Sequence, residues 1–315
     1  MNQVIFTRGL PGSGKSTWAR ELIASDDSWV RVNLDAIRAM FGSAFSKENE
    51  RLAVKLQDDA ILSALRAGKN VIVDNTHLHK GNAGMGPQHI MTLIWEAGFP
   101  VVYEVVDFHT PFEECWARNL NRAANPKETD SAAVPDEAMR RMLKTQQREI
   151  DRGLWTPEQI QVNLPVVEPY VPPAGKPKVY LFDIDGTLAN TSHRSPYDFD
   201  RLSEDTLNEH VGAVYRALDL DGAVGGVIMS GRSEQFRPTT ELWLDREGIR
   251  NYWDFFMRKE GDTRRDSVVK LELFNEYVRD NFQVIGAFDD RLRVCRIWHQ
   301  IGIPVLRVGA PDDDF

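Results

Sequence analysis

Short apolar runs alternate with longer amphipathic segments along the first half of the chain. The runs rich in Val, Ile and aromatic residues predict β-strands at residues 4–7, 29–33, 70–75 and 100–108. Helical spacing of apolar positions occurs between them, at residues 15–24, 48–68 and 135–153. Strands that alternate with helices are typical of a parallel, doubly wound sheet. The first half is therefore predicted to be an α/β domain.

The same alternation resumes after a proline-rich segment. Residues 164–178, LPVVEPYVPPAGKPK, hold five prolines, which restrict φ and remove backbone donors, so they predict an extended linker. Further strands are predicted at residues 178–184, 224–231, 283–290 and 304–309. The chain is thus expected to form two doubly wound α/β domains, residues 1–163 and 179–315, joined by the linker 164–178.

Charge and composition narrow the classes of function. The 315 residues carry a net charge of −9, of which −2 falls on residues 1–160 and −7 on the remainder. A general nucleic-acid binder has a basic footprint, so any such contact must be a local cationic groove, expected near Asp35. Two distant cysteines, Cys115 and Cys295, favour a reducing compartment. No signal peptide or membrane span is apparent, which predicts an intracellular protein.

A phosphate-binding loop follows the first predicted strand. Residues 9–16, GLPGSGKS, satisfy G-x-x-x-x-G-K-[ST] and open a helix, which is the context that the motif requires. Glycines let backbone amides approach phosphates, Lys15 reaches the outer phosphates, and Ser16 can hold magnesium. We therefore expect ATP to bind at Gly9, Pro11, Gly12, Ser13, Gly14, Lys15, Ser16 and Thr17.

Three further groups in this half are candidates for phosphate transfer. Asp35 ends the second strand and could accept a proton from an alcohol, while Arg38 could bind an anionic acceptor. An equally simple interpretation is that Asp35 caps a helix and Arg38 is solvated. Arg118 and Arg122, four residues apart, could cover the transferring phosphates or form a solvated helix face. Asp74 ends another strand and could touch a metal-bound water or serve as a cap.

A second phosphate chemistry is indicated after the linker. The sequence LFDIDGTL places Asp183 and Asp185 at a strand end. Asp183 is a candidate nucleophile that forms an aspartyl-phosphate, and Asp185 a candidate proton donor and acceptor. Carboxylates facing a phosphate need a divalent cation, and Mg²⁺ suits oxygen ligands. The candidate metal ligands here are Asp183, Asp185, Asp289 and Asp290.

Other polar residues follow at successive predicted strand ends. Ser230 offers a hydroxyl and Arg232 a planar donor to a phosphate, and Lys270 could balance the charge of the intermediate. Each alone is also a common turn, cap or surface residue. Together and in this order, they resemble the haloacid dehalogenase phosphatase superfamily, although fold likeness alone does not fix a substrate.

The motifs of both halves resemble the bacteriophage-type bifunctional polynucleotide 5′-kinase/3′-phosphatase family. The resemblance rests on GLPGSGKSTWARE, NLDAIR, the two arginines of the WARNLNR segment, SHRSPYD, SGR, GDTRRDSVVK and DDR. It implies that Asp35 is the general base, that Arg38 contacts the acceptor phosphate and that Arg122 contacts ATP, with Arg118 as a helper. In the second half it implies active-site roles for Arg194, Arg232, Asp266 and Lys270, and metal binding by Asp290 and the main chain of Asp185.

The resemblance also implies a function and its surroundings. The enzyme would phosphorylate 5′-hydroxyl ends of RNA or DNA and remove 3′-phosphates and 2′,3′-cyclic phosphates, using ATP and Mg²⁺, so that a nucleic-acid ligase can join the ends. A cytoplasmic location in a phage-infected bacterial host and a homo-oligomer, a tetramer, are implied as well. The alternatives are a metabolite kinase fused to a metabolite phosphatase, and a nucleotide-binding scaffold without catalysis. The intact acids Asp35, Asp183 and Asp185 argue against the scaffold.

Overall fold

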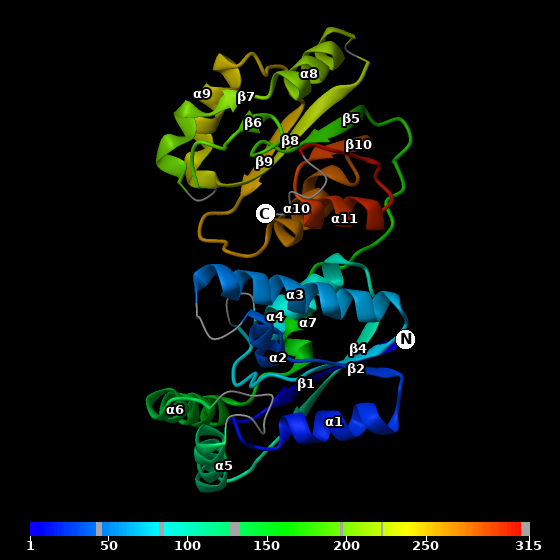
Figure 1. The fold of residues 1–315 in the computed structure, drawn as a ribbon. Coiled ribbons are helices and arrows are strands. Elements are labelled where there is room, and N and C mark those ends of the chain that lie inside the picture. The colour runs from blue at the N-terminus through cyan, green and yellow to red at the C-terminus, as the bar shows by residue number, and fades with distance from the viewer. Residues whose placement is uncertain (42–45, 82–84, 126–132, 196–197, 222, 310–315) are drawn as a thin grey trace. The chain divides into compact units, whose positions relative to one another are not determined.

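A computed structural model describes the chain except residues 42–45, 82–84, 126–132, 196–197, 222 and 310–315 (Figure 1). The chain divides into two compact units, Met1–Leu164 and Pro165–Phe315. Within the described residues, no helix is long and apolar enough to cross a membrane.

The first unit is built on a four-stranded parallel sheet. Its strands are β1 (Asn2–Arg8), β2 (Trp29–Val32), β3 (Asn70–Val73) and β4 (Val101–Asp107), in the order β2-β3-β1-β4. Its helices are α1 (Lys15–Ser25), α2 (Leu34–Arg38), α3 (Lys47–Arg66), α4 (Pro87–Glu96), α5 (Phe112–Ala124), α6 (Asp136–Arg152) and α7 (Pro157–Gln161). The predicted doubly wound α/β arrangement is confirmed.

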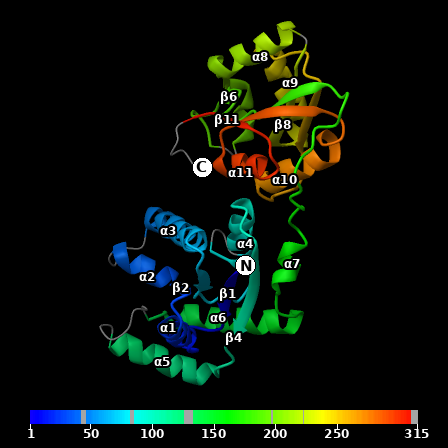
Figure 2. The same cartoon turned by 90° about the vertical axis from the view of Figure 1, so that its right-hand side faces the viewer.

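Helices cover both faces of this sheet. Figures 1 and 2 show α3 and α4 on one face and α1 on the other, with α5 and α6 beyond the carboxyl ends of the strands. On the α3–α4 side, Ile61 and Ile90 pack against strand residues such as Phe6 and Val71. A second cluster joins Leu10, Leu78, Cys115 and Met139, which fixes α5 and α6 above the sheet's carboxyl edge. That edge is where ligands bind in open α/β sheets.

The second unit has a five-stranded parallel sheet in the order β11-β10-β5-β8-β9. These strands are β5 (Lys178–Phe182), β8 (Gly225–Ser233), β9 (Asp254–Arg258), β10 (Gln283–Asp289) and β11 (Val305–Arg307), and a small antiparallel pair is formed by β6 (Ala189–Asn190) and β7 (Thr206–Leu207). The helices are α8 (Glu209–Asp221), α9 (Arg237–Arg246), α10 (Asp266–Leu273) and α11 (Leu292–Gln300). Shorter helical segments span Phe199–Glu204, Glu234–Phe236 and Phe274–Val278, and in the first unit Ala39–Phe41. Phe182 lies at the centre of the core, stacked on Phe288 at a ring-centroid distance of 4.7 Å.

Candidate active sites

The phosphate-binding loop connects β1 to α1 at the carboxyl edge of the first sheet. Gly12 adopts φ +86°, and a Cβ atom there would lie 2.6 Å from the backbone oxygen of Cys115. Glycine is therefore required both for the left-handed conformation and for the close packing of α5 against the loop. The loop leads directly into α1, which begins at Lys15, so the amino end of a helix faces the same space.

Lys15 lies inside the loop that it is predicted to serve. Its Nζ donates to the backbone oxygens of Leu10 at 2.7 Å and Gly9 at 3.0 Å. Burial lowers the pKa of Lys15 to about 8, although the charge of Asp74 opposes that shift. The ammonium is thus held at the cradle by neutral carbonyl groups.

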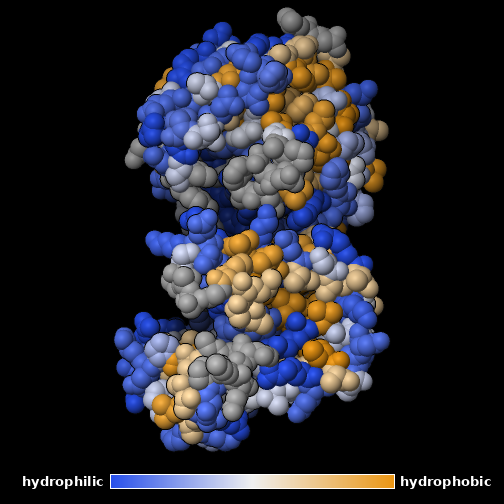
Figure 3. All heavy atoms as spheres, viewed as in Figure 1, coloured by the Kyte–Doolittle hydropathy of each residue, from blue (hydrophilic) through white to orange (hydrophobic). Residues whose placement is uncertain are grey.

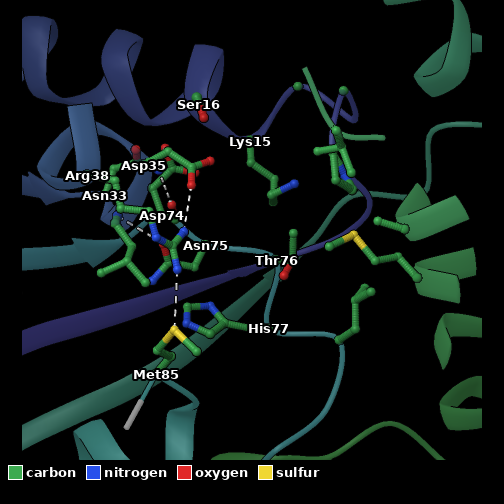
Figure 4. Close-up of a pocket in the computed structure, with 18 of the residues that line it drawn as sticks. Lys15, Ser16, Asn33, Asp35, Arg38, Asp74, Asn75, Thr76, His77 and Met85 are labelled. Atoms are coloured by element: carbon green, nitrogen blue, oxygen red, sulfur yellow. Dashed lines mark hydrogen bonds and ion pairs between the residues drawn. The ribbon is translucent and has the colours of Figure 1, made fainter. Parts of the chain in front are cut away.

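Asp35 and Arg38 extend from α2 toward the same space (Figure 4). The cap of α2 is Asn33, whose side chain accepts from the Ala36 amide, so Asp35 is free of that role. Asp35 has a half-exposed side chain and accepts from Arg38 Nη1 at 2.8 Å. Arg38 is also paired with Glu50 of α3, with Nε 3.0 Å from Oε2. Arg38 is therefore held between two carboxylates, one of which the sequence had not singled out.

Asp74 is buried at the end of β3 and binds the neighbouring strand. It pairs with Arg31 of β2 at 2.7 Å, and its backbone oxygen accepts from the Asn33 side chain. Thr7 at the end of β1 donates to its Oδ1 at 3.4 Å. These contacts align the ends of three adjacent strands, where the phosphate loop and α2 begin.

One pocket of about 650 Å³ brings these groups together. The loop residues Lys15 and Ser16, the Asp35–Arg38 pair and Asp74 line it with Arg122 of α5. Its lining holds the cations Lys15, Arg20, Arg38, Arg122 and Arg141 against the carboxylates Asp35 and Asp74, so its balance is positive within a unit that is slightly acidic overall. That balance favours an anionic ligand.

The two predicted covering arginines differ in position. Arg122 lines the pocket, whereas Arg118 is absent from its lining, donates to the backbone oxygen of Gly12 at 2.9 Å and pairs with Glu114. Arg118 therefore stabilises the phosphate-binding loop from outside the pocket lining. Arg141 of α6 lines the pocket and had no distinguishing signal in the sequence, because it occurs in an ordinary amphipathic helix with several other basic residues.

His77 predicts a pH effect on the stability of the first unit. It is buried, with φ +40°, and its Nδ1 lies 2.9 Å from the backbone oxygen of Thr7. Burial lowers its pKa to about 4, so it is neutral in the folded state at neutral pH. The unfolded chain binds the proton near pH 6.5, so stability should be lost as pH falls from 6.5 to 4, by up to about 3 kcal/mol.

Urea unfolding followed between pH 4 and 7 checks this. The His77→Asn variant, which tolerates positive φ, should lose most of the pH dependence, and the exposed His109→Asn should keep it. A slope unchanged by His77→Asn would contradict the assignment.

The second site gathers carboxylates at the ends of two adjacent strands. Asp183 follows β5, and Asp289 and Asp290 lie at the end of its neighbour β10. Oxygens of these three side chains lie within 4.8 Å of one another, and Asp290 Oδ1 is buried with no hydrogen-bond partner among the described residues. Gly186, at φ +83°, makes room for them, because a Cβ there would lie 2.2 Å from Asp290 Oδ2. A cluster of oxygen donors with an unsatisfied carboxylate oxygen fits Mg²⁺.

Lys270 lies inside this cluster. Its Nζ is 2.7 Å from both Asp183 Oδ1 and Asp289 Oδ2, and all three side chains are buried. Burial would lower the pKa of Lys270, but Asp183 and Asp289 raise it above its ordinary value, so the lysine stays charged. Burial raises the pKa of Asp183, and Asp289 adds to that shift, while Lys270 opposes it. One ammonium does not balance three carboxylates, which again favours an added cation.

Asp185 lies apart from the three clustered carboxylates and is held by two arginines. Its Oδ1 accepts from Arg194 Nη2 at 2.6 Å and Arg232 Nη2 at 2.8 Å, and its Oδ2 accepts from Arg232 Nε at 2.9 Å. Burial would raise the pKa of Asp185, but the hydrogen bonds and charge of Arg232, followed by those of Arg194, lower it. Arg232, predicted to bind phosphate, and Arg194, predicted to belong to the active site, are therefore neutralised by carboxylates of the chain itself.

Asp205 completes this arrangement and was missed by the sequence analysis. It is fully buried and accepts from Arg194 Nε at 2.7 Å and Arg232 Nη2 at 2.7 Å. Its backbone oxygen accepts from Trp243 Nε1 at 2.7 Å. Asp205 follows no strand of the main sheet and belongs to no motif, so only the folded chain reveals it.

Two further predicted residues lie near this centre. Asp266 begins α10 and pairs with Arg258 and Arg291, while a Cβ on Gly231 would lie 2.7 Å from Asp266 Oδ1. Ser230 is buried, and its Oγ accepts from the Arg232 amide at 3.2 Å. Asp266 thus orients basic residues, whereas Ser230 contacts the backbone of Arg232 in the irregular end of β8.

Comparison with known proteins finds a family match in each half of the chain. Residues 177–315 match the family described as the polynucleotide kinase PNKP phosphatase domain, and residues 4–148 match the AAA domain family. A protein of Autographa californica nuclear polyhedrosis virus, named "Putative bifunctional polynucleotide kinase/RNA ligase", is 29% identical over 326 residues. The match covers 96% of this chain but only 42% of that protein, so the chain spans about two fifths of the length of its relative.

Solved structures give a similar sequence match. A chain of the Pnkp1/Rnl/Hen1 RNA repair complex is 26% identical, with 99% of the present chain and 97% of that chain covered, and a TM-score of 0.45. A chain from a second structure of the Pnkp1/Rnl/Hen1 complex has the same identity and TM-score, with 98% of that chain covered. The family matches confirm the predicted resemblance of a kinase-type domain followed by a phosphatase domain.

Proposed function

We propose that the chain heals broken nucleic-acid ends by phosphorylating 5′-hydroxyls and removing 3′-phosphates. The observation that carries this proposal is the presence of two separate candidate phosphate sites, one in each unit. In the first, the phosphate loop shares a pocket with Asp35 and Arg122, and in the second, Asp183 contacts Lys270. The phosphatase-domain match supports a polynucleotide substrate over a small metabolite.

In the proposed kinase reaction, the loop binds the phosphates of ATP. Lys15 exchanges its carbonyl partners for phosphate oxygens, and Ser16 is placed to hold the magnesium that accompanies the nucleotide. Asp35 accepts the proton of the 5′-hydroxyl as its oxygen attacks the γ-phosphorus, and ADP leaves. Arg38 binds an acceptor phosphate and Arg122 the transferring group.

In the proposed phosphatase reaction, an oxygen of Asp183 attacks phosphorus and the 3′-oxygen leaves. Asp185, which takes up a proton once the phosphate has drawn the arginines away from it, gives that proton to the leaving oxygen and then takes one from the water that hydrolyses the aspartyl-phosphate. The incoming phosphate offers Arg194 and Arg232 another anion, which releases Asp185 toward the leaving oxygen. Asp183, Asp289 and Asp290 would hold Mg²⁺, which when bound lowers the repulsion between carboxylate and phosphate. A 2′,3′-cyclic phosphate is a second proposed substrate.

The ligase partner and the homo-oligomer, a tetramer, implied by the resemblance stay predictions. The product ends, 5′-phosphate and 3′-hydroxyl, are those that a nucleic-acid ligase joins, which supports a ligase as the next enzyme. Phosphate and terminal hydroxyl contacts do not distinguish RNA from DNA, so both are proposed substrates.

The test of this function uses one short oligonucleotide with a 5′-hydroxyl and a 3′-phosphate. It is incubated with ATP and Mg²⁺ and analysed by mass spectrometry beside Lys15→Ala and Asp183→Asn. The wild type should gain a phosphate at one end and lose one at the other, and each variant should lose only one of the two changes. Turnover of a nucleoside, sugar or small phosphate ester, with both oligonucleotide ends unchanged, would favour the metabolite alternative.

Asp35→Asn is expected to reduce 5′-phosphorylation by about a hundredfold to ten-thousandfold, because the variant cannot accept the hydroxyl proton. The 3′-phosphatase rate should remain within twofold, since Asp35 belongs to the other unit. Initial rates with γ-labelled ATP provide the measurement. Asp59→Asn on α3, outside the pocket lining, is the control. Retention of half the wild-type kinase rate would exclude Asp35 as the base.

A further inference from the structure

We propose that Arg141 of α6 binds an internucleotide phosphate of the acceptor strand and thereby selects polynucleotides over single nucleotides. The inference rests on the proposed kinase function and adds a residue that the motifs do not identify. It is carried by the position of Arg141 in the pocket lining, by its lack of a partner among the described residues, and by the side of the pocket on which α6 lies.

None of the described residues occupies the donors of Arg141. Its side chain makes no hydrogen bond or ion pair with any residue in the described part of the chain, and it is exposed at the pocket. Arg38, by contrast, is paired with Asp35 and Glu50, and the preceding Arg140 with Asp136. A guanidinium without a carboxylate partner offers bidentate hydrogen bonds to a phosphate at no cost of breaking an ion pair.

The donor side of the pocket is supplied by α5. Arg118 donates to the loop oxygen of Gly12, and the positive charge of Arg122 contributes to the lowered pKa of Lys15, which places both arginines beside the phosphate loop. Arg141 comes from a different helix. The phosphates of ATP, the donor, can therefore be bound by cations other than Arg141.

Helix α6 forms part of the pocket on the side where we expect the acceptor strand to bind. The pocket face of α6 carries Ala138, Arg141, Met142 and Thr145, at the spacing of one helix face. Met142 packs on the cluster that contains Leu78, in the segment between β3 and α4. The same segment supplies Met85, whose sulfur lies 3.4 Å from Arg38 Nη2 (Figure 4). Arg141 on α6 and Arg38 on α2 therefore lie at the same wall of the pocket, which the segment between β3 and α4 forms.

This wall suits a strand rather than a triphosphate. Apolar lining residues Leu78, Met85, Val134 and Met142 offer surface for a base or sugar, and the two arginines offer charge for phosphates. Figure 3 shows that hydrophilic residues predominate on the visible surface over α5 and α6. A chain of nucleotides alternates apolar bases with anionic phosphates, so its chemistry matches this lining.

The experiment compares Arg141→Gln and Arg141→Lys with the matched control Arg140→Gln, which lies on the same helix but outside the pocket lining. Acceptors are a 5′-hydroxyl nucleoside 3′-monophosphate and 5′-hydroxyl oligonucleotides of two to ten residues. Arg141→Gln should raise the KM for the longer acceptors about tenfold and lower the dependence of log KM on log salt by about one unit. The KM for ATP and for the mononucleotide should stay within twofold, and Arg141→Lys should recover part of the loss.

The outcomes separate this inference from the function on which it rests. A raised KM for ATP with an unchanged acceptor KM would place Arg141 on the donor side and overturn the inference. Equal behaviour of Arg141→Gln and Arg140→Gln on every acceptor would also overturn it, while the kinase function stands. If the wild type phosphorylates no oligonucleotide, the proposed function itself fails.

Discussion

Replacing Asp183 by Asn should reduce removal of 3′-phosphate at least about a thousandfold, because an amide oxygen cannot form the aspartyl-phosphate. The substitution is isosteric, so Lys270 keeps Asp289 as its charged partner and the fold of the second unit should persist. The kinase rate should remain within twofold. Release of inorganic phosphate from a 3′-phosphorylated oligonucleotide gives the rate, and intact-protein mass spectrometry after acid quench shows whether the covalent adduct disappears.

Asp280→Asn, an exposed carboxylate of the same unit, is the control for the loss of one charge. If Asp183→Asn keeps more than a tenth of the wild-type rate, or still acquires a phosphate adduct, the nucleophile is another carboxylate of the cluster. Asp289 would then be examined, since it too contacts Lys270.

Asp205→Ala is expected to lower the free energy of unfolding of the second unit by about 3–5 kcal/mol, as when one partner of a buried ion pair is removed. The side chains of Arg194 and Arg232 are completely buried, and without Asp205 they would share the single carboxylate of Asp185. The phosphatase rate should fall with it, because both guanidiniums lose their fixed orientation. Urea unfolding monitored by tryptophan fluorescence gives the stability change.

Asp205→Asn is the matched variant, because it keeps the shape and one acceptor oxygen while removing the charge. Its free energy of unfolding should fall less than that of the alanine variant. Its affinity for phosphate should still differ from that of the wild type. Kinase activity measured in the same samples reports whether the first unit is intact. A stability loss below about 1 kcal/mol for Asp205→Ala, the value of an exposed pair, would show that Asp185 alone satisfies both arginines.

The sequence predicted every strand of the two main sheets except β9, together with several of the residues at their carboxyl ends, because local pattern determines both. The apolar run before Gly9 and the one before Asp183 each end at the edge of a parallel sheet, so the motif itself fixes the place of Lys15 and Asp183. Asp183 and Asp289 then meet because β5 and β10 are neighbours in the sheet, an order that the structure supplies.

The missed residues depend on contacts between segments that no local pattern connects. Glu50 meets Arg38 because α3 packs beside α2, and Asp205 meets Arg194 because the chain returns past it after β6. Arg141 is indistinguishable in sequence from Arg140, and only the rotation of α6 decides which of them lines the pocket. Such choices follow from tertiary packing and not from motif spacing.

The second site also has a structural reason to bind simple anions weakly. This reason lies in four charged residues, Arg194, Arg232, Asp185 and Asp205. Their charges cancel, so the centre does not attract abundant simple anions in the way that two bare guanidiniums would. The Asp185 carboxylate acts as a built-in placeholder for the phosphate. A competing anion must offer as much charge and as many acceptor oxygens as that placeholder, and a terminal phosphate does. In the proposed reaction, the candidate acid Asp185 would thus also protect the two arginines from the salt of the surroundings.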